Sequence, residues 1–301
     1  MASPMNTGSF AQLLTKDYEK VFFDEFDRWP EEWSQLAKIE NHSTYSVKEG
    51  EMVGMGAMDD INEGAPIPYD GFTQGNEKEI TFTNYAKALA ITENMYDDDL
   101  KGHMKKGMQE LGKSAAYTNE LEFWDILNTG FVTTYRTGLD SAALFTATHA
   151  LFDSASNCAN MTTGAALSYT SLQGLLDTFD AVKNHKGIPI PYVPQVLWIP
   201  PGLKWKAEEL LMSPLEPGTA NNQINTVKSI ADLKYKMVHY FTSTTAYFIS
   251  AANHDLRYMR RKGLQMKGTD DFNTGNALMK SSMRFTVDFF DWRGIAGNAG
   301  V

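Results

Sequence analysis

Arg284-Phe-Thr-Val-Asp-Phe-Phe-Asp-Trp-Arg-Gly294 is the stretch that decides the fold class of this chain. Its aromatic and apolar residues alternate with polar ones, which predicts a closing strand with one buried face. Trp292 lies within this stretch, and we expect its side chain to anchor the strand in the core. A protein that closes on such a strand needs other elements to pack against it.

A long helix is predicted upstream, over residues 97–129. Three aspartates, Asp97 to Asp99, place negative charge at its start, where the helix dipole favours it. An apolar stripe follows at spacings of three and four; its members are Leu100, Met104, Met108, Leu111 and Ala115. Near the end, apolar residues spread around the helix, which predicts fuller burial there; they are Phe123, Trp124, Ile126 and Leu127.

Three glycines interrupt the predicted helix at a spacing of five: Gly102, Gly107 and Gly112. A glycine inside a helix costs about 1 kcal/mol relative to alanine, so each needs a reason. A step of five residues turns by roughly 140° around the axis, so the three do not line one groove. Packing against a single partner helix then explains at most one of them. We expect the glycines to let the helix flex.

Residues 41–95 are predicted to form two strand arms joined by a long loop. Glu79-Ile-Thr-Phe-Thr83 alternates and places Ile80 and Phe82 on one face. The middle, residues 62–71 and then Gly75-Asn76, is rich in residues that break regular structure. A lone hairpin is marginally stable, and so long a loop is unusual inside a compact domain. Both difficulties disappear if the hairpin lies on a neighbouring subunit; the alternative is a mobile surface insertion.

The remaining pattern mixes short helices and strands, which predicts an α+β protein. Helical spacing covers residues 10–26, and Thr170 with Gln173 predicts a capping box at the start of another helix. Residues 196–199 are predicted to be a buried strand, residues 203–211 a helix and residues 246–249 a further strand. Residues 137–168 are predicted to be irregular with a short hairpin.

The composition is that of a globular protein. Apolar residues make up 43% of the 301 residues, which is enough for a core and excludes a wholly disordered chain. The formal charge of −10 argues against a dedicated surface for nucleic acid. A single cysteine, Cys158, excludes an intrachain disulfide framework and indicates a reducing compartment. We expect neither a signal peptide nor a membrane-spanning segment.

No catalytic or cofactor motif is complete. Asp97-x-Asp99 begins like a calcium loop, but Lys101 and Met108 occupy positions that need oxygen ligands. Gly54-Met-Gly56 lacks the third glycine of a dinucleotide fingerprint. The six histidines have no ligand spacing, and Cys158 in its polar run is weak evidence for a nucleophile. We therefore predict no catalytic, cofactor-binding or metal-binding residues, no cofactor and no enzyme activity.

The densest basic run is Arg257-Tyr-Met-Arg-Arg-Lys262. Four of its side chains, those of Arg257, Arg260, Arg261 and Lys262, are candidates for a charged contact with nucleic acid or with acidic neighbours. The alternative, which the acidic chain favours, is a solvated or intersubunit charged face.

In this order the parts resemble the major capsid proteins of tailed bacteriophages. Pro217-Gly-Thr-Ala-Asn-Asn222, followed by Ile224-Asn-Thr-Val227, resembles a loop-then-strand segment of some Mu-like major head subunits. Asp288-Phe-Phe-Asp-Trp-Arg-Gly294 resembles their closing strand. The resemblance covers nearly the whole chain in order.

The resemblance implies an α+β tailed-phage capsid fold with four parts. These are an N-arm (1–40), an E-loop hairpin (41–95), a P-domain with the long spine helix and terminal strands (96–135 and 237–301), and an A-domain (136–236). It also implies that the tip of the E-loop contacts another subunit, through Pro66, Ile67, Pro68, Tyr69 and Phe72. In relatives the spine helix is bent in the immature shell and straighter in the mature one, which would use the flexing assigned to Gly102, Gly107 and Gly112.

The implied function is structural: self-assembly into the icosahedral head that encloses the DNA genome of a tailed phage. Such a protein is located in the virion and is assembled in the cytoplasm of the bacterial host. Its partners would be itself, as hexamers and pentamers, together with scaffold, portal and decoration proteins. It would enclose DNA without sequence-specific binding, and no membrane would be involved. Encapsulins share the fold, so a protein nanocompartment shell is the alternative; a soluble enzyme of unrecognised type is the second.

Overall fold

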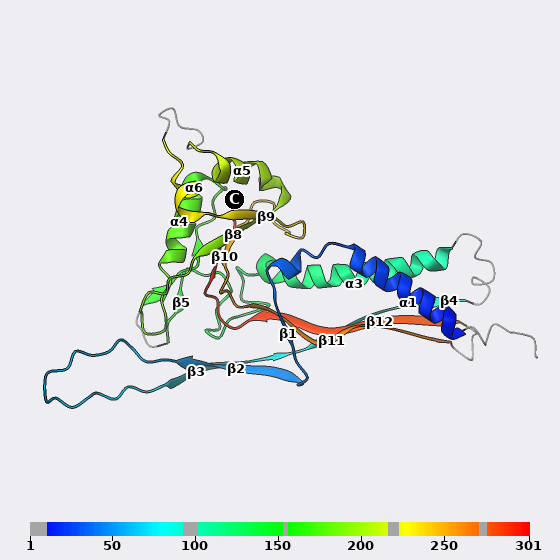
Figure 1. Ribbon diagram of the computed structural model, residues 1–301, viewed down its shortest axis with the longest axis horizontal. Coiled ribbons are helices and arrows are strands. Elements are labelled where there is room, and N and C mark those ends of the chain that lie inside the picture. The colour runs from blue at the N-terminus through cyan, green and yellow to red at the C-terminus, as the bar shows by residue number, and fades with distance from the viewer. Residues whose placement is uncertain (1–10, 93–101, 153–155, 216–222, 271–275) are drawn as a thin grey trace, which may run out of the picture. The chain divides into compact units, whose positions relative to one another are not determined.

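The computed structural model describes residues 11–92, 102–152, 156–215, 223–270 and 276–301. These residues form two compact units, shown as ribbons in Figure 1. Unit 1 comprises residues 1–45, 81–123 and 258–287, and unit 2 comprises residues 46–80, 124–257 and 288–301. Each unit combines helices with a β-sheet, so the predicted α+β class is confirmed.

Unit 1 packs two helices against one face of a four-stranded sheet. The helices are α1 (Ala11–Arg28) and α3 (His103–Asn128), and a short 3-10 helix η2 (Trp33–Gln35) follows α1. The sheet has the order β1 (Lys38–Asn41), β11 (Leu256–Asp270), β12 (Ala277–Phe289), β4 (Thr83–Ile91). Apolar residues of both helices and of the sheet form one core, built from Phe22, Met108, Leu111, Ala115, Met266 and Met279.

The pairing of β12 with β4 fixes which side chains face the helices. The two strands are antiparallel, with Met283 opposite Tyr85 and Ser281 opposite Lys87. Odd-numbered residues of both strands lie on the helix side, where Met279 and Leu89 join the core. Even-numbered residues of the same strands therefore lie on the other face.

Unit 2 is built on a five-stranded sheet. Its order is β7 (Met161–Thr162), β13 (Ile295–Asn298), β10 (Tyr247–Ala251), β8 (Pro194–Ile199), β9 (Lys234–Met237). Its helices are α4 (Tyr169–Asp180), η3 (Pro201–Leu203), α5 (Lys204–Met212) and α6 (Thr226–Ala231). Every residue of β10 is buried. This central strand is therefore covered on both faces. Its odd-numbered residues join a core with Leu172 and Ala207, and Phe248 packs on Phe145 and Phe241.

Two smaller sheets complete unit 2. One pairs β2 (Ser46–Val53) with β3 (Thr73–Thr81), and the other pairs β5 (His149–Ala150) with β6 (Asn157–Cys158). Both two-stranded pairs had been predicted as hairpins. The first has a long connecting loop, residues 54–72, which Figure 1 shows at the left.

Several sequence-based predictions are confirmed. Strand 196–199 and helix 203–211 fall on β8 and α5, and Ile80 and Phe82 are both buried. The predicted burial at the end of the long helix is found at Phe123, Trp124, Ile126 and Leu127. The helix predicted over residues 10–26 falls on α1.

The start of the long helix is corrected. Helix α3 begins at His103, and Gly102 precedes it with a φ of 71°, in the left-handed region that glycine tolerates. Its carbonyl accepts a hydrogen bond from the backbone N–H of Lys106 at 3.2 Å, so Gly102 occupies the N-cap position. The aspartates at 97–99 lie outside the described residues.

Four further local predictions are wrong. The capping box of α4 uses Ser168 and Ser171 in place of Thr170 and Gln173. The closing strand β12 ends at Phe289, and Gly75-Asn76 lies within β3. Residues 224–227, which the resemblance implies to be a strand, instead enter helix α6, where Asn225 is the N-cap and accepts from Lys228 N–H. Residues 216–222 lie outside the described residues.

Candidate assembly surfaces

The β2 arm of the long hairpin is fixed by contacts within unit 2. Arg257 donates through Nη1 to Glu49 Oε1 at 2.5 Å and through Nε to Asp255 Oδ1 at 2.6 Å. Although burial lowers the pKa of Arg257, these two carboxylates raise it above its ordinary value, so the cation is held in place. Two positions further along β2, Glu51 pairs with His185 at 2.6 Å.

The β3 arm is fixed by a lysine that is mostly buried. Lys78 Nζ donates to Asp288 Oδ1 at 2.8 Å, to the Thr137 carbonyl at 2.7 Å and to the Phe289 carbonyl at 2.8 Å. Three acceptors satisfy all three protons of an ammonium group. Burial lowers the pKa of Lys78, and the neighbouring Asp288 opposes that shift. The base of the hairpin is therefore a satisfied internal structure.

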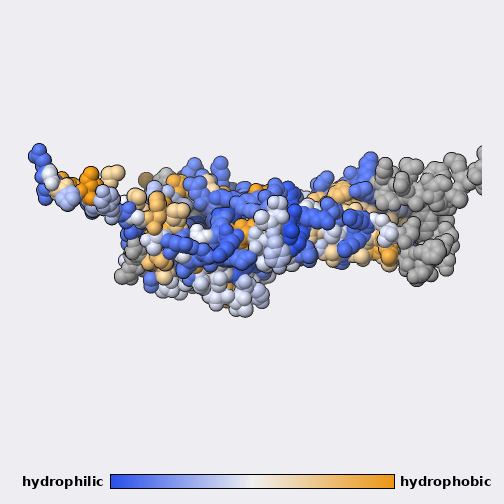
Figure 2. All heavy atoms as spheres, turned by 90° about the horizontal axis from the view of Figure 1, so that it is seen from below, coloured by the Kyte–Doolittle hydropathy of each residue, from blue (hydrophilic) through white to orange (hydrophobic). Residues whose placement is uncertain are grey.

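The loop of the hairpin, residues 54–72, has the opposite character. Its apolar side chains are exposed: Met58 and Tyr69 completely, Ile67 at 72% and Phe72 at 65%. All five residues predicted for the E-loop tip are exposed, namely Pro66, Ile67, Pro68, Tyr69 and Phe72. Figure 2 shows hydrophobic residues interspersed with hydrophilic ones along this loop, at the left. Large apolar side chains in water are typical of a surface that another molecule covers.

Asp70 draws the two ends of the loop together. Its Oδ2 accepts from Gly56 N–H at 3.0 Å and its Oδ1 from Gly71 N–H at 2.8 Å. The hydrogen bonds from Gly56 and then Gly71 lower the pKa of this carboxyl. The loop therefore has an internal brace, although its apolar residues lack a core.

The four residues of the basic run do not share one face of the sheet. Arg257 is committed to Glu49 and Asp255, and Arg260 donates to Asn41 Oδ1 at 2.9 Å. On β11, Leu264 and Met266 belong to the core beneath the helices, so even-numbered side chains face that side. Arg261 and Lys262 consequently lie on opposite faces of the sheet. Whether any of the four contacts a partner stays a prediction.

The two helical glycines have a packing reason that the sequence analysis missed. A Cβ on Gly112 would lie 2.5 Å from the carbonyl oxygen of Phe22, so α1 and α3 approach closely here. A Cβ on Gly107 would lie 2.8 Å from Leu89 Cδ2, on β4. Packing against a single partner helix explains only Gly112, as expected, because Gly112 faces α1 whereas Gly107 faces strand β4. Flexing remains a prediction without support from these contacts.

A buried polar cluster in unit 2 was not foreseen. His149 is fully buried, with Nδ1 2.5 Å from Asp140 Oδ2 and Nε2 3.1 Å from Asn160 Oδ1. Its ring stacks on Trp292 at 3.9 Å, with 7° between the planes. Burial opposes ionisation of Asp140, but the contact with His149 outweighs it and lowers the pKa of that carboxyl. The sequence spacing does not predict this cluster, because His149 is nine residues from Asp140 and eleven from Asn160 along the chain.

Asn160 ties the cluster to the backbone. Its Nδ2 donates to the carbonyls of Leu144 at 2.6 Å and Ile295 at 3.2 Å, and its Oδ1 accepts from Thr146 N–H at 3.0 Å. All the polar groups of the cluster are thus used for structure. Cys158 lies opposite His149 in the pairing of β5 with β6. It is buried, which does not fit a reactive thiol on the surface.

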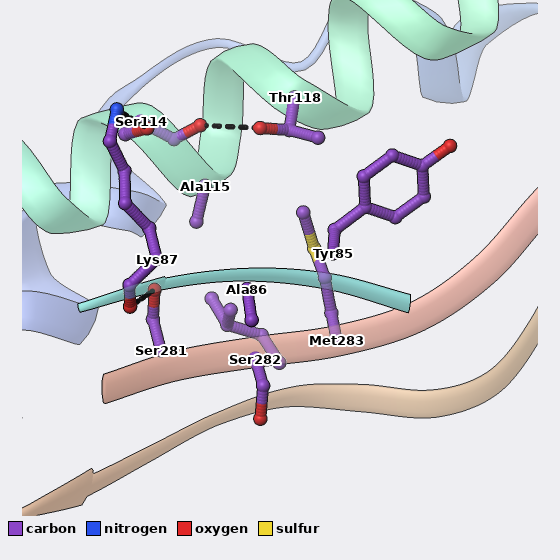
Figure 3. Close-up of a pocket in the computed structure, with 10 residues that line it drawn as sticks. Tyr85, Ala86, Lys87, Ser114, Ala115, Thr118, Ser281, Ser282 and Met283 are labelled. Carbon is purple, nitrogen blue, oxygen red and sulfur yellow. Dashed lines mark hydrogen bonds between the residues drawn. The ribbon is translucent and has the colours of Figure 1, made fainter. Parts of the chain in front are cut away.

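A small cavity of about 180 Å³ lies between α3 and the sheet of unit 1 (Figure 3). Lys87 Nζ donates to Ser114 Oγ at 3.0 Å on its wall, and Thr118 donates to the Ser114 carbonyl at 2.8 Å. Small side chains such as Ala115 and Ser281 leave this space open.

Other site types find no support in the part of the chain that the structure describes. Among those residues, no group of three or more histidine, cysteine, aspartate or glutamate side chains could hold a metal ion. No described helix is long and apolar enough to cross a membrane.

Three solved structures share this fold across most of the chain. The capsid of cyanophage P-SCSP1u is 11% identical in sequence, and the match covers 88% of this chain and 86% of the cyanophage chain with a TM-score of 0.58. The virus-like particle from Pyrococcus furiosus is 10% identical, with coverage of 95% and 99% and a TM-score of 0.55. The capsid of bacteriophage JBD30 decorated with minor capsid protein trimers is 13% identical, with coverage of 71% and 92% and a TM-score of 0.55. The architecture is therefore the fold of capsid subunits, as predicted.

A family model described as phage capsid protein matches residues 75–298, which is more than half of the chain. The chain belongs to the phage capsid protein family. It is a structural protein of the phage head shell, and its place is in the virion. Comparison with curated protein sequences gives no match.

Proposed function

We propose that copies of this chain assemble, as hexamers and pentamers, into the icosahedral head that encloses the DNA genome of a tailed phage. Assembly takes place in the cytoplasm of the bacterial host. The DNA is enclosed without sequence-specific binding, in keeping with the formal charge of −10. Family membership supports the shell, and the surfaces of the chain support assembly through repeated contacts between copies.

One observation carries the proposal: the contrast between a satisfied hairpin base and an apolar, exposed loop. Exposed side chains such as Met58, Ile67, Tyr69 and Phe72 gain nothing within this chain. Covering them on another copy would remove apolar surface from water, which is the main favourable term in association. Many contacts of this kind around a closed shell add up to high avidity.

The four-part division remains part of the proposal, with two refinements. Strands β10 and β13, from the predicted P-domain segment 237–301, lie in the five-stranded sheet of unit 2, so we assign them to the A-domain. Strand β4 pairs with β12 in the sheet of unit 1, so we restrict the E-loop to the hairpin of residues 46–81. Residues 1–40 then serve as the N-arm, α3 as the spine helix of the P-domain, and the helices on the five-stranded sheet as the A-domain. Scaffold, portal and decoration proteins are further proposed partners; the JBD30 capsid, for comparison, carries minor capsid protein trimers.

Electron microscopy of the expressed chain tests the proposal. We expect closed icosahedral shells, and heads filled with DNA when the other phage head proteins are present. Shells that instead enclose a protein cargo would favour a nanocompartment. A small fixed oligomer that never forms shells, even together with the other head proteins, would contradict both.

A further inference from the structure

The cavity between α3 and the unit 1 sheet lies where large core side chains give way to small ones. On the helix side of β12, Ser281 stands between Met279 and Met283, because alternate residues of a strand share a face. Figure 3 shows Ala115 pointing from the helix toward the sheet at this place. The residues of α3 that line the cavity are all small: Ser114, Ala115 and Thr118. Helix and sheet therefore leave a space of about 180 Å³ that the chain itself does not fill.

One side of the cavity is apolar. Met283 and Ala115 are buried there, and Leu264 of β11 and Tyr85 of β4 are half-buried in its wall. The Tyr85 ring is held in place by stacking on Phe285 at 4.7 Å. An engineered apolar cavity of about 150 Å³ in another protein binds benzene. The space in this chain is therefore large enough for one ring or a short alkyl chain.

The other side carries a lysine and two hydroxyl groups. Lys87 is exposed at the mouth, and its Nζ donates to Ser114 Oγ at 3.0 Å, which uses one of the three protons of an ammonium group. Ser114 Oγ accepts that bond, so its own proton remains available. Ser281 is buried, and its hydrogen bond to the Lys87 carbonyl is long, at 3.4 Å against about 2.7–2.8 Å for a typical hydroxyl donor. This side therefore offers more donors than the chain uses.

No acid lies in the wall of the cavity. Among the described residues, no carboxylate forms an ion pair with Lys87, and none of the ten lining residues is an aspartate or glutamate. Positions 83–91 of β4, 256–269 of β11 and 277–287 of β12 also contain no acid. On α3, Glu110 and Glu122 lie one turn before Ser114 and one turn after Thr118, and neither lines the cavity. A negatively charged group at Lys87 would therefore meet no carboxylate in the wall.

We propose that this cavity binds a small organic acid, whose carboxylate meets Lys87 and Ser114 and whose apolar body lies against Met283 and Ala115. The space fits one ring or a short chain, on the order of ten non-hydrogen atoms in all. Water is the alternative occupant, but the apolar side offers it no hydrogen bonds. The inference goes beyond the proposed shell function and does not depend on it, because every lining residue belongs to unit 1 of a single chain.

Ligand binding to the full chain tests the proposal. The probe is para-fluorobenzoate, its neutral counterpart is para-fluorobenzyl alcohol, and fluorine NMR follows both. We expect the benzoate to saturate one site per chain and to bind about fivefold more tightly than the alcohol, since an ion pair with an exposed lysine contributes modestly. The midpoint of thermal unfolding should rise with benzoate concentration, because the ligand binds only the folded chain.

Two variants separate the polar side of the cavity from the apolar side. Lys87→Met should weaken benzoate binding about fivefold and leave the affinity for the alcohol unchanged. Ala115→Leu fills the apolar side and should abolish the binding of both probes. The matched control is Lys106→Met, which makes the same change at an exposed lysine of α3 outside the cavity and should bind like the wild type.

A measurement on the wild-type chain covers the case in which Ala115→Leu does not fold. The methionine methyl groups are labelled with carbon-13, and the signals of Met283 and Met212 are assigned by replacing each residue with leucine. We expect the benzoate to shift the Met283 signal and to leave that of Met212, which is exposed on α5 in unit 2.

Three results would overturn the proposal. The first is the absence of saturable benzoate binding up to about 10 mM, which would leave water as the occupant. The second is a Met283 signal that does not move when the benzoate binds. The third is equal affinity for the acid and the alcohol in both the wild type and Lys87→Met. A chain that binds the benzoate but never forms shells would contradict the proposed function alone.

Discussion

The two ends of the hairpin differ in every property that decides whether a surface belongs to the fold or to a partner. At the base, Lys78, Arg257 and Glu49 are held in short hydrogen bonds, and Val47 is buried. In the loop, Tyr69 and Met58 are fully exposed. The base resembles a protein interior and the loop resembles half of an interface. Stability and assembly should therefore respond to different mutations along one short segment.

The largest effect on stability is expected at Trp292, in the segment that follows strand β12. Trp292 is buried, follows Asp288 and Phe289 closely in the chain, and stacks on His149. Trp292→Ala should lower the free energy of unfolding by about 3–5 kcal/mol, through lost burial and a cavity. Denaturant titration of the purified chain measures this. A loss below about 1 kcal/mol would mean that the site relaxes around the missing ring.

A smaller loss is expected from the base itself. Lys78→Ala leaves Asp288 without its cation and should cost about 2–3 kcal/mol. This lies below the 3–5 kcal/mol of a fully buried pair, because 16% of the lysine side chain remains exposed. The control is Lys48→Ala on the same hairpin, whose pair with Glu77 is exposed and should contribute little. Equal losses in the two variants would contradict the distinction between base and surface.

A third region, the contact of α1 with α3, extends the comparison to unit 1. Gly112→Ala places a methyl group against the Phe22 carbonyl and should cost about 1–2 kcal/mol, since backbone must move. Gly107→Ala meets only the end of the Leu89 side chain, which can rotate away, so its effect should be smaller. Thermal or denaturant unfolding compares the two. If both variants are stabilised, the glycines serve flexing after all.

The smallest effect on stability is expected at the loop. Replacing residues 57–69 by a short Gly-Ser turn keeps the brace of Asp70 and should change the free energy of unfolding by less than about 0.5 kcal/mol. The same variant should fail to form shells, as electron microscopy would reveal. Normal particles from this variant would show that the exposed apolar residues are not an assembly surface.

Local patterns predicted most of the elements because they are repeated over many residues. The alternation around Ile80 and Phe82 and the apolar stripe at Met104, Met108 and Leu111 report burial directly. Order along the chain then predicted the capsid fold. Boundaries were less accurate where one residue decides them: nothing in the sequence distinguishes Gly102 as an N-cap from a glycine inside the helix.

The reasons for particular residues depended on contacts between distant segments. Gly112 faces Phe22, and His149 meets Asp140, Asn160 and Trp292, which a spacing rule does not bring together. The basic run at residues 257–262 was not predicted correctly as one surface for the same reason, since Arg257 forms an ion pair with Glu49, some two hundred positions away in the sequence.

The place of β13 in its sheet has a consequence for the timing of synthesis. This strand, Ile295–Asn298, lies between β7 and β10, and the sheet of unit 1 likewise needs β12 beside β4. Neither sheet can close while the ribosome still holds these residues. A nascent subunit would therefore carry its apolar loop long before it has a finished body to present it. Contacts between copies would begin only once β12 and β13 have left the ribosome and joined their sheets, so that unfinished chains are kept out of the growing shell.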